Sequence, residues 1–275
     1  MNTQPILIVT PTLGESLYLN QTVACVAALP LPVIHVLSVP ARKVETLQAR
    51  YPHARVVPDA GKAGGIYGAI NAGLGAAPDG WKWFTYINDD DLLLPAFGQV
   101  AREHFAQANP EPVVYGDVEL IDESSRRITR ITTTPRPDWI PDLLAQGISP
   151  LMQQGMLFSH ETVKRLGGFD TRYRLCADLD FWVRAFASGQ RFRYYAQSIA
   201  QFRLRTGQLS GATSVTMREQ DDIVACHLHP PVAPLRRRAV RLGYRLYNLP
   251  RYLARIRSSG LRTSYQLLQH GTARA

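Results

Sequence analysis

The chain has 275 residues, of which 45% are hydrophobic and 19% charged, so disorder, collagen and coiled coil are excluded as descriptions of the whole chain. The net charge of +9 is uneven, because residues 1–222 hold 21 Lys and Arg and all 22 Asp and Glu, whereas residues 223–275 hold ten Arg and no acid. A nearly neutral body, at −1, therefore precedes a tail of +10. This asymmetry indicates an appendage with an acidic partner rather than a basic protein.

The cysteines and the N-terminus indicate the compartment. Three cysteines without a CxxC pair disfavour a disulfide framework and fit a reducing environment. No basic segment precedes the short apolar run at residues 6–9, and no stretch looks like a membrane span. We therefore expect a cytoplasmic body that can be peripheral on the inner face of the cell membrane through its tail.

The first hundred residues alternate between expected strands and helices. Expected strands lie at 6–10, 33–39, 55–57 and 83–87, and expected helices at 16–29, 41–51, 64–75 and 95–107. This alternation predicts a parallel α/β sheet, in which ligands bind beyond the carboxyl ends of the strands. The turns at 11–15, 59–65 and 88–92 lie at such ends.

The pattern changes after Glu111. Expected strands lie at 113–117, 127–133, 154–158, 191–195 and 199–205, and expected helices at 138–146, 160–166, 177–187 and 213–227. This second half is more typical of a cap or an acceptor-binding half than of a second Rossmann unit.

Three adjacent carboxylates, Asp89, Asp90 and Asp91, follow the fourth expected strand. Such clustering costs repulsion unless a cation compensates it. In an extended chain Asp89 and Asp91 point the same way, and Mg2+ combines few protein carboxylates with water and substrate phosphates. The triplet therefore favours a metal–diphosphate site, although capping of the helix near Pro95 accounts for one Asp.

A glycine-rich segment, residues 59–73, opens the third expected helix. Glycines allow close approach of a ligand, a helix N-terminus favours anions, and Lys62 adds a point charge for phosphate. The segment is neither a Walker A motif nor a clear GxGxxG after the first strand. A tight turn with close helix–sheet packing explains it equally well.

A second acidic pair, Asp178 and Asp180, lies in the first turn of the helix expected at 177–187. The helix dipole favours carboxylates there, so capping explains one of them. The alternative is a general base, which needs hydrogen-bond reach to a hydroxyl proton. Local spacing does not choose between these interpretations.

These motifs follow one another in an order known from one family. The order is Pro11-Thr12, Gly65-Ile-Tyr-x-Ala-x-Asn-x-Gly73, Asn88-Asp-Asp-Asp91, Val114-Tyr-Gly-Asp117, Gln153-Gln154, Gly167-Gly-Phe-Asp170 and Ala177-Asp-x-Asp-Phe-Trp-x-Arg184. Over residues 4–210 the chain resembles a family 2 inverting glycosyltransferase with the GT-A fold, of the type that builds bacterial surface polysaccharides. The resemblance implies an α/β fold with a Rossmann-like mixed sheet flanked by helices.

The resemblance also implies the reaction: one sugar moves from a nucleotide-diphosphate-sugar to a hydroxyl of a saccharide or lipid-linked saccharide, with Mg2+ or Mn2+ as cofactor. The expected donor site comprises Pro11, Thr12, Lys62, Gly65, Ala69, Asn71, Asp89 and Asp90. Asp91 and Asp89 are the expected metal ligands, and Gln154 and Arg184 the expected acceptor side. Asp178 is the first choice as base and Asp180 the second.

The expected domain covers residues 1–230, with a nucleotide-sugar-binding half at 1–110 and an acceptor-binding half at 111–230. The family's usual Asp-Gly-Ser-x-Asp is absent at 37–40, which leaves recognition of the base open, and Gly14 and Gly68 replace a common Asn and Asp. The Gln-x-x-Arg-Trp motif of processive synthases is missing, since residues 201–205 are only superficially similar. Transfer of a single sugar is therefore expected.

The tail, residues 231–275, is expected to form a basic amphipathic helix. An apolar stripe recurs at steps of four and three residues and is flanked by Arg: Leu235, Ala239, Leu242, Leu246, Leu249, Leu253 and Ile256. Pro250 is expected to kink or split this helix. The stripe either lies on an anionic membrane, through residues 235–262, or packs on the body of the protein.

Two other functions have weaker support in the sequence. A sugar nucleotidyltransferase usually needs a glycine-rich, Arg-containing loop after the first strand, which residues 11–14 lack. A non-catalytic nucleic-acid-binding protein acting through the Arg tail is disfavoured by the regular apolar stripe and the neutral body, so no nucleic acid partner is expected. The pair His227-x-His229 is a weak metal signal and is interpreted as a surface turn.

Overall fold

A computed structural model describes residues 4–205, 214–228 and 233–269, with side chains in the last helix described to Pro250 and at Leu253. In this part of the chain, nine strands form one mixed sheet in the order β3-β2-β1-β4-β8-β6-β9-β5, and β7 pairs with β6. The strands are β1 (Ile6–Pro11), β2 (Val33–Pro40), β3 (Arg55–Asp59), β4 (Trp83–Tyr86), β5 (Leu92–Leu93), β6 (Val113–Ile121), β7 (Arg127–Ile131), β8 (Leu157–Ser159) and β9 (Phe192–Arg203).

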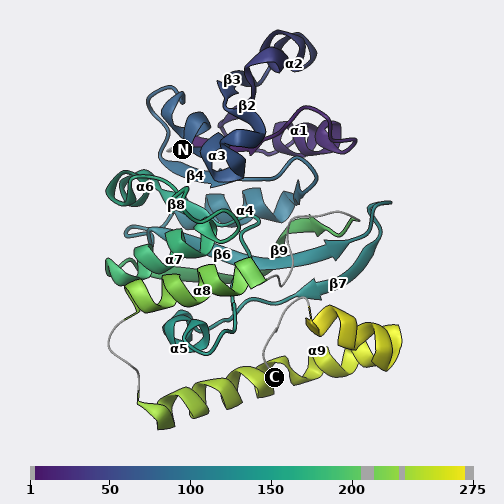
Figure 1. Ribbon diagram of the computed structural model, residues 1–275, viewed down its shortest axis with the longest axis vertical. Helices are drawn as coiled ribbons and strands as arrows, with labels where there is room; N and C mark the ends of the chain where they lie inside the picture. Colours follow the sequence, from purple (N-terminus) through teal and green to yellow (C-terminus); the bar gives the residue numbers. More distant parts are fainter. Residues whose placement is uncertain (1–3, 206–213, 229–232, 270–275) are drawn as a thin grey trace.

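Helices cover both faces of the sheet (Figure 1). Those described are α1 (Leu19–Ala27), α2 (Val44–Arg50), α3 (Gly65–Gly75), α4 (Pro95–Phe105), α5 (Ile140–Leu144), α6 (His160–Leu166), α7 (Ala177–Ala187), α8 (Ser214–His227) and α9 (Pro234–Gln269), with 3-10 turns at 41–43, 61–63 and 137–139. The predicted mixed α/β sheet flanked by helices is therefore confirmed.

Strands β1 to β4 form the parallel half of the sheet. β1 pairs in parallel with β2 and β4, and β2 with β3, so their carboxyl ends meet at one edge. All six residues of β1 are buried, which explains why this strand is a continuous apolar run. Side chains of α3 and α7 pack on one face of the sheet, and side chains of α1 and α4 pack on the other.

The second half adds antiparallel pairing. β8 runs antiparallel to β4 and β6, and β9 runs parallel to β6. The strands expected at 191–195 and 199–205 form one strand, β9, because register shifts opposite Gly116 and Asp117 absorb the irregular residues as a bulge. β8 is also shorter than expected, since Gln153 and Gln154 precede it in a loop.

The tail forms one helix, α9, which continues through Pro250 rather than splitting there. It runs along the lower edge of Figure 1 beneath α5, with which it makes contacts. Across the described residues, no helix combines the length and the apolar character that crossing a membrane demands.

Candidate functional site

The carboxyl ends of β1 and β4 bring Thr12 and Asp89 together. The Thr12 hydroxyl donates a hydrogen bond of 2.5 Å to Asp89 Oδ2, and the Ser16 hydroxyl donates one of 2.9 Å to the Asp89 carbonyl. The Thr12 backbone N–H binds the Ser38 carbonyl at 2.9 Å, which holds the end of β1 against β2. Asp89 is only partly buried, and desolvation raises its pKa to about 6, so it combines a fixed position with access to solvent.

Asp91 lies deeper, with no exposed surface. Its Oδ1 accepts the Arg203 backbone N–H at 2.9 Å, and its Oδ2 accepts the Gln154 amide at 3.0 Å and the Asn88 amide at 3.3 Å. Burial is the main cause that raises the pKa of Asp91 well above its usual range, and the charge of the neighbouring Asp90 adds to the effect. The predicted acceptor residue Gln154 thus acts here by orienting Asp91.

Two buried oxygens beside Asp91 have no hydrogen-bond partner among the described residues. They are Asn88 Oδ1 and Gln154 Oε1, the other ends of the amides that donate to Asp91. No three His, Cys, Asp or Glu side chains converge in the described ranges. A hard cation such as Mg2+ or Mn2+ would therefore have to combine carboxylate oxygens of Asp89 and Asp91 with these amide oxygens, water and substrate phosphate.

A buried arginine, Arg203, holds the acidic turn in place. Its Nε donates to the Asp90 carbonyl at 2.9 Å, and its guanidinium carbon lies 4.1 Å from the centre of the Tyr18 ring. Further hydrogen bonds reach the Gln21 side chain in α1 at 2.9 Å and the Asp122 carbonyl after β6 at 3.0 Å. Arg203 therefore joins three segments that are distant in sequence.

Asp90, expected to bind the donor, pairs instead with an arginine in this arrangement. Arg205 Nε lies 2.5 Å from Asp90 Oδ2, and Asp90 is buried. Asp90 and Arg205 thus hold the end of β9 against the acidic turn.

Asp178 begins α7 and faces the glycine-rich helix α3. The Tyr67 hydroxyl donates to Asp178 Oδ1 at 3.0 Å, and the Leu179 backbone N–H donates to the same oxygen at 2.8 Å. Desolvation outweighs these contacts and raises the pKa of Asp178 to about 6. Asp178 remains partly exposed, so its carboxyl combines a raised pKa with access to solvent.

Tyr86, the last residue of β4, connects the two acidic centres. The Tyr86 side chain is buried, and this burial raises the pKa of its hydroxyl far above the usual range, with further contributions from the nearby charges of Asp178 and Asp91. The Asp89–Asp91 turn and Asp178 therefore both lie close enough to Tyr86, at the carboxyl end of β4, to influence its pKa.

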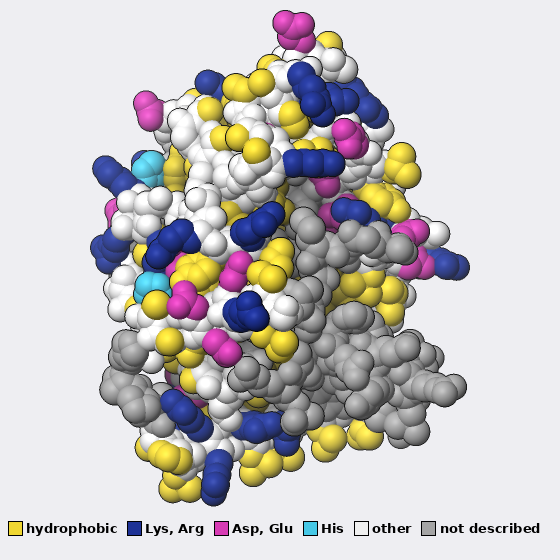
Figure 2. Space-filling view, viewed as in Figure 1, with side chains coloured by type: hydrophobic (Ala, Val, Ile, Leu, Met, Phe, Trp, Pro, Cys, Tyr) yellow, Lys and Arg dark blue, Asp and Glu magenta, His cyan; other side chains and the backbone are white. Residues whose placement is uncertain are grey.

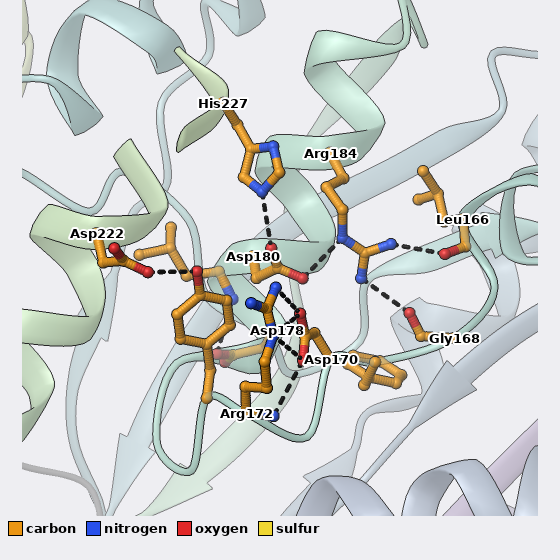
Figure 3. A network of polar contacts seen from close by, with 12 residues as sticks. Leu166, Gly168, Asp170, Arg172, Asp178, Asp180, Arg184, Asp222 and His227 are labelled. Atoms are coloured by element: carbon orange, nitrogen blue, oxygen red, sulfur yellow. Dashed lines mark hydrogen bonds and ion pairs between the residues drawn. The ribbon is translucent and has the colours of Figure 1, made fainter. Parts of the chain in front are cut away.

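Asp180, the alternative base, is buried in a structural ion pair (Figure 3). Arg184 Nε lies 2.7 Å from Asp180 Oδ2, and the other guanidinium nitrogens bind the carbonyls of Leu166 at 2.7 Å and Gly168 at 2.8 Å. His227 Nε2, at the end of α8, lies 3.3 Å from Asp180 Oδ1, so the predicted surface turn was wrong for His227, whereas His229 lies outside the described residues. Asp180 and Arg184 thus tie α7 to α6 and α8.

The glycine-rich segment contributes both structural and accessible groups. The Asn71 side chain exchanges two hydrogen bonds, of 2.7 and 2.9 Å, with the Phe169 backbone, and Ala69 is buried. By contrast, Lys62 and Gly65 are exposed, and Gly65 has a φ of +66°, which favours glycine. Of the four residues of this segment expected in the donor site, Lys62 and Gly65 are therefore the ones exposed to a ligand.

Comparison with known proteins gives structural relatives only. No family model matches this chain, and no curated protein matches its sequence. Crystal structures of S. aureus TarS do match: residues 1–349 align with a TM-score of 0.58 at 15% identity, covering 86% of this chain and 69% of that chain. A longer TarS structure aligns with a TM-score of 0.59 at 14% identity, covering 94% of this chain and 44% of that chain. TarS residues 1–349 in complex with UDP align with a TM-score of 0.57 at 12% identity, covering 86% of this chain and 69% of that chain.

The chain has a GT-A-like glycosyltransferase fold. The structure also adds side chains that the sequence analysis had not assigned to the site, among them Arg203, Tyr67 and Asp59. Arg203 lies in the segment 201–205, which only superficially matches the Gln-x-x-Arg-Trp motif, and Tyr67 belongs to the glycine-rich motif without a predicted role of its own. Asp59, at the end of β3, accepts the Gly61 backbone N–H at 2.5 Å and the Ser38 hydroxyl at 3.1 Å, so it shapes the turn that carries Lys62.

Proposed function

We propose that the protein is a metal-dependent inverting glycosyltransferase, which moves one sugar from a nucleotide-diphosphate-sugar to a hydroxyl of a saccharide or lipid-linked saccharide in the synthesis of a bacterial surface polysaccharide or glycolipid. The observation that carries the proposal is the partly exposed Asp178, with its raised pKa, at the same sheet edge as the Thr12–Asp89 pair. The GT-A-like fold and the UDP complex of TarS support it.

The donor would bind along the carboxyl ends of β1 to β4. Thr12 and Asp89 offer a preformed polar pair there, and Lys62 and Gly65 are exposed at the turn after β3. Lys62 supplies a positive charge for phosphate, and Gly65 lets backbone approach the ligand closely. Uridine diphosphate is one donor class to test, because a TarS structure contains UDP.

Asp178 is the proposed general base. As the acceptor oxygen attacks the anomeric carbon, its proton passes to the Asp178 carboxylate, the bond to the diphosphate breaks, and the nucleoside diphosphate leaves with the bonding electrons. A single in-line displacement inverts the anomeric centre. Tyr67 orients the carboxylate through its hydrogen bond, and holding both substrates at one edge supplies much of the rate.

The cofactor would be Mg2+ or Mn2+, held by Asp89 and Asp91 with the amide oxygens of Asn88 and Gln154 nearby. When bound, such an ion neutralises negative charge on the diphosphate leaving group. The deep position of Asp91 means that Asp89 is the carboxylate more accessible to a donor.

Donor binding can be tested by thermal unfolding of the whole chain with each nucleoside diphosphate, with and without Mn2+. A matching ligand at a hundredfold excess over Kd stabilises the folded state by about 2.7 kcal/mol, or a Tm increase of about 5–10 °C for a chain of this size. Asp89→Ala should lose this shift. The control Asp79→Ala, an exposed aspartate before the opposite end of β4, should keep it. If no nucleoside diphosphate shifts the Tm of folded protein, the donor site is refuted.

The pH dependence of transfer tests Asp178 as base. Since only the carboxylate accepts a proton and its pKa is raised to about 6, kcat/KM should rise with pH through about 6 and then level off. The Tyr67 hydroxyl stabilises the charged form, so in Tyr67→Phe the rise should move to higher pH. Tyr51→Phe, whose hydroxyl binds Asn20, is the matched control and should leave the profile unchanged. A profile that is flat across pH 6 contradicts this role.

A further inference from the structure

The tail helix α9 is attached to the body through one of its faces. Val240 and Asn248 are buried, and a Cβ at Gly243 would lie only 2.8 Å from Trp139 Cη2, so the helix packs closely there. Arg236 Nε lies 3.0 Å from Asp142 Oδ2 in α5, and the Gln146 amide donates to the Arg237 carbonyl at 3.2 Å. Tight packing, an ion pair and a hydrogen bond therefore fix which face of α9 points to the body.

The face of α9 away from the body carries a stripe of leucines. The stripe consists of five exposed side chains: Leu235 (79% exposed), Leu242 (58%), Leu246 (58%), Leu249 (47%) and Leu253 (49%). Their spacing of seven, four, three and four residues places them on one side of a helix. Figure 2 shows hydrophobic side chains interspersed with Lys and Arg along the lower edge, where α9 lies. The leucine stripe thus does not pack on the body, one of the two alternatives that the sequence left open.

The charge around the leucine stripe has one sign. Arg238 and Arg245 are exposed within one helical turn of the leucines, and neither forms an ion pair with a described carboxylate. The sequence contains no Asp or Glu after Asp222. Any surface that covers the stripe therefore has to accept both apolar side chains and uncompensated positive charge.

We propose that the leucine stripe of α9 binds the surface of an anionic lipid membrane, with the helix in the plane of the interface. The leucines would enter the boundary between headgroups and acyl chains, and Arg238 and Arg245 would lie at the lipid phosphates. A second copy of the chain is a poorer occupant, because it would bring two helices of high positive charge together. Nucleic acid would neutralise the arginines but leave the leucines in water.

The attachment of α9 gives this binding a direction. The docked face and the leucine stripe lie on opposite sides of the same helix, so a membrane on the stripe would hold the body on the far side of α9 in one orientation. This inference uses no residue of the proposed catalytic or donor site and does not depend on the transferase activity.

Flotation of the full chain with vesicles tests the proposal. One set of vesicles contains equal parts of phosphatidylglycerol and phosphatidylcholine, and the other contains phosphatidylcholine alone. The wild-type protein is expected to float with the anionic vesicles and to bind neutral ones at least tenfold less. Leu242→Ser/Leu246→Ser/Leu249→Ser should reduce binding to anionic vesicles by about tenfold or more, because each loss of buried apolar side chain weakens insertion.

Two further variants separate the contributions. Arg238→Gln/Arg245→Gln should weaken binding at low salt and reduce its salt dependence, whereas Leu17→Ser, which removes an exposed leucine outside α9, should change nothing. Because all the altered side chains are exposed, circular dichroism and Tm should match those of the wild type. The proposal is overturned if folded wild-type protein does not float with anionic vesicles or if the triple serine variant floats equally well. It is also overturned if the stripe mediates dimers instead. In that case light scattering would show a wild-type dimer that the triple serine variant loses, and neither protein would bind vesicles.

Discussion

Asp178→Asn is expected to lower kcat by about 100-fold to 10,000-fold, the range that a positioned general base contributes. The amide is nearly the same size as the carboxylate and can still accept the hydrogen bonds of Tyr67 and Leu179. It cannot take the proton of the acceptor. Binding of the nucleoside diphosphate, measured by thermal shift, should therefore stay close to the wild-type value while the rate of transfer falls.

A nearby aspartate provides the control for this variant. Asp170 lies in the segment before α7 and pairs with Arg172 at 2.7 Å near the surface (Figure 3). Asp170→Asn removes the same charge from the same region, and we expect its kcat to change less than about threefold. If Asp178→Asn retains wild-type kcat, or if both variants lose activity equally, Asp178 is not the base.

Arg203→Met is expected to destabilise the folded chain by about 3–5 kcal/mol, the cost of removing one partner from a buried charged network. Its main-chain N–H would remain on Asp91, but the Asp90 and Asp122 carbonyls and the Gln21 side chain would each lose a buried donor. Denaturant unfolding monitored by tryptophan fluorescence measures this loss. Because Arg203 holds the acidic turn, the folded fraction of Arg203→Met should also bind nucleoside diphosphate more weakly than the wild type does.

Another arginine of the same strand gives the comparison. Arg193 is exposed in β9 and lies over the Tyr195 ring at 5.8 Å, so Arg193→Met should change the free energy of unfolding by at most about 1 kcal/mol. Arg203→Lys keeps the charge but not the fork of donors, and it should recover only part of the stability. Equal stability of Arg203→Met and Arg193→Met would show that the buried network contributes little.

The sequence alone determined the elements whose signals are local. The helix predicted at 160–166 was found at the same residues, because Ser159 caps its first turn and Gly167, with a φ of +73°, ends it. The helix predicted at 177–187 was also found at the same residues. The alternation of the first hundred residues correctly predicted the parallel strands, and with them the shared edge at which Thr12 and Asp89 meet.

Only the tertiary structure decided which of these residues act together. Arg203 meets Asp91, and His227 meets Asp180, across long stretches of sequence, and no local periodicity encodes such contacts. The two carboxylates of α7 have nearly the same local surroundings, yet packing buries Asp180 against Arg184 and leaves Asp178 partly exposed beside Tyr67.

The tail shows the same division. Its repeat of leucines was enough to predict an amphipathic helix, because an apolar stripe at steps of three and four residues follows from helix geometry. The face that docks on the body was decided by shape and polar pairing instead: Gly243 leaves room for Trp139, and Arg236 reaches Asp142. Hydrophobic pattern alone does not record such complementarity, which is why the sequence predicted the leucine stripe and the fold determined that it faces outward.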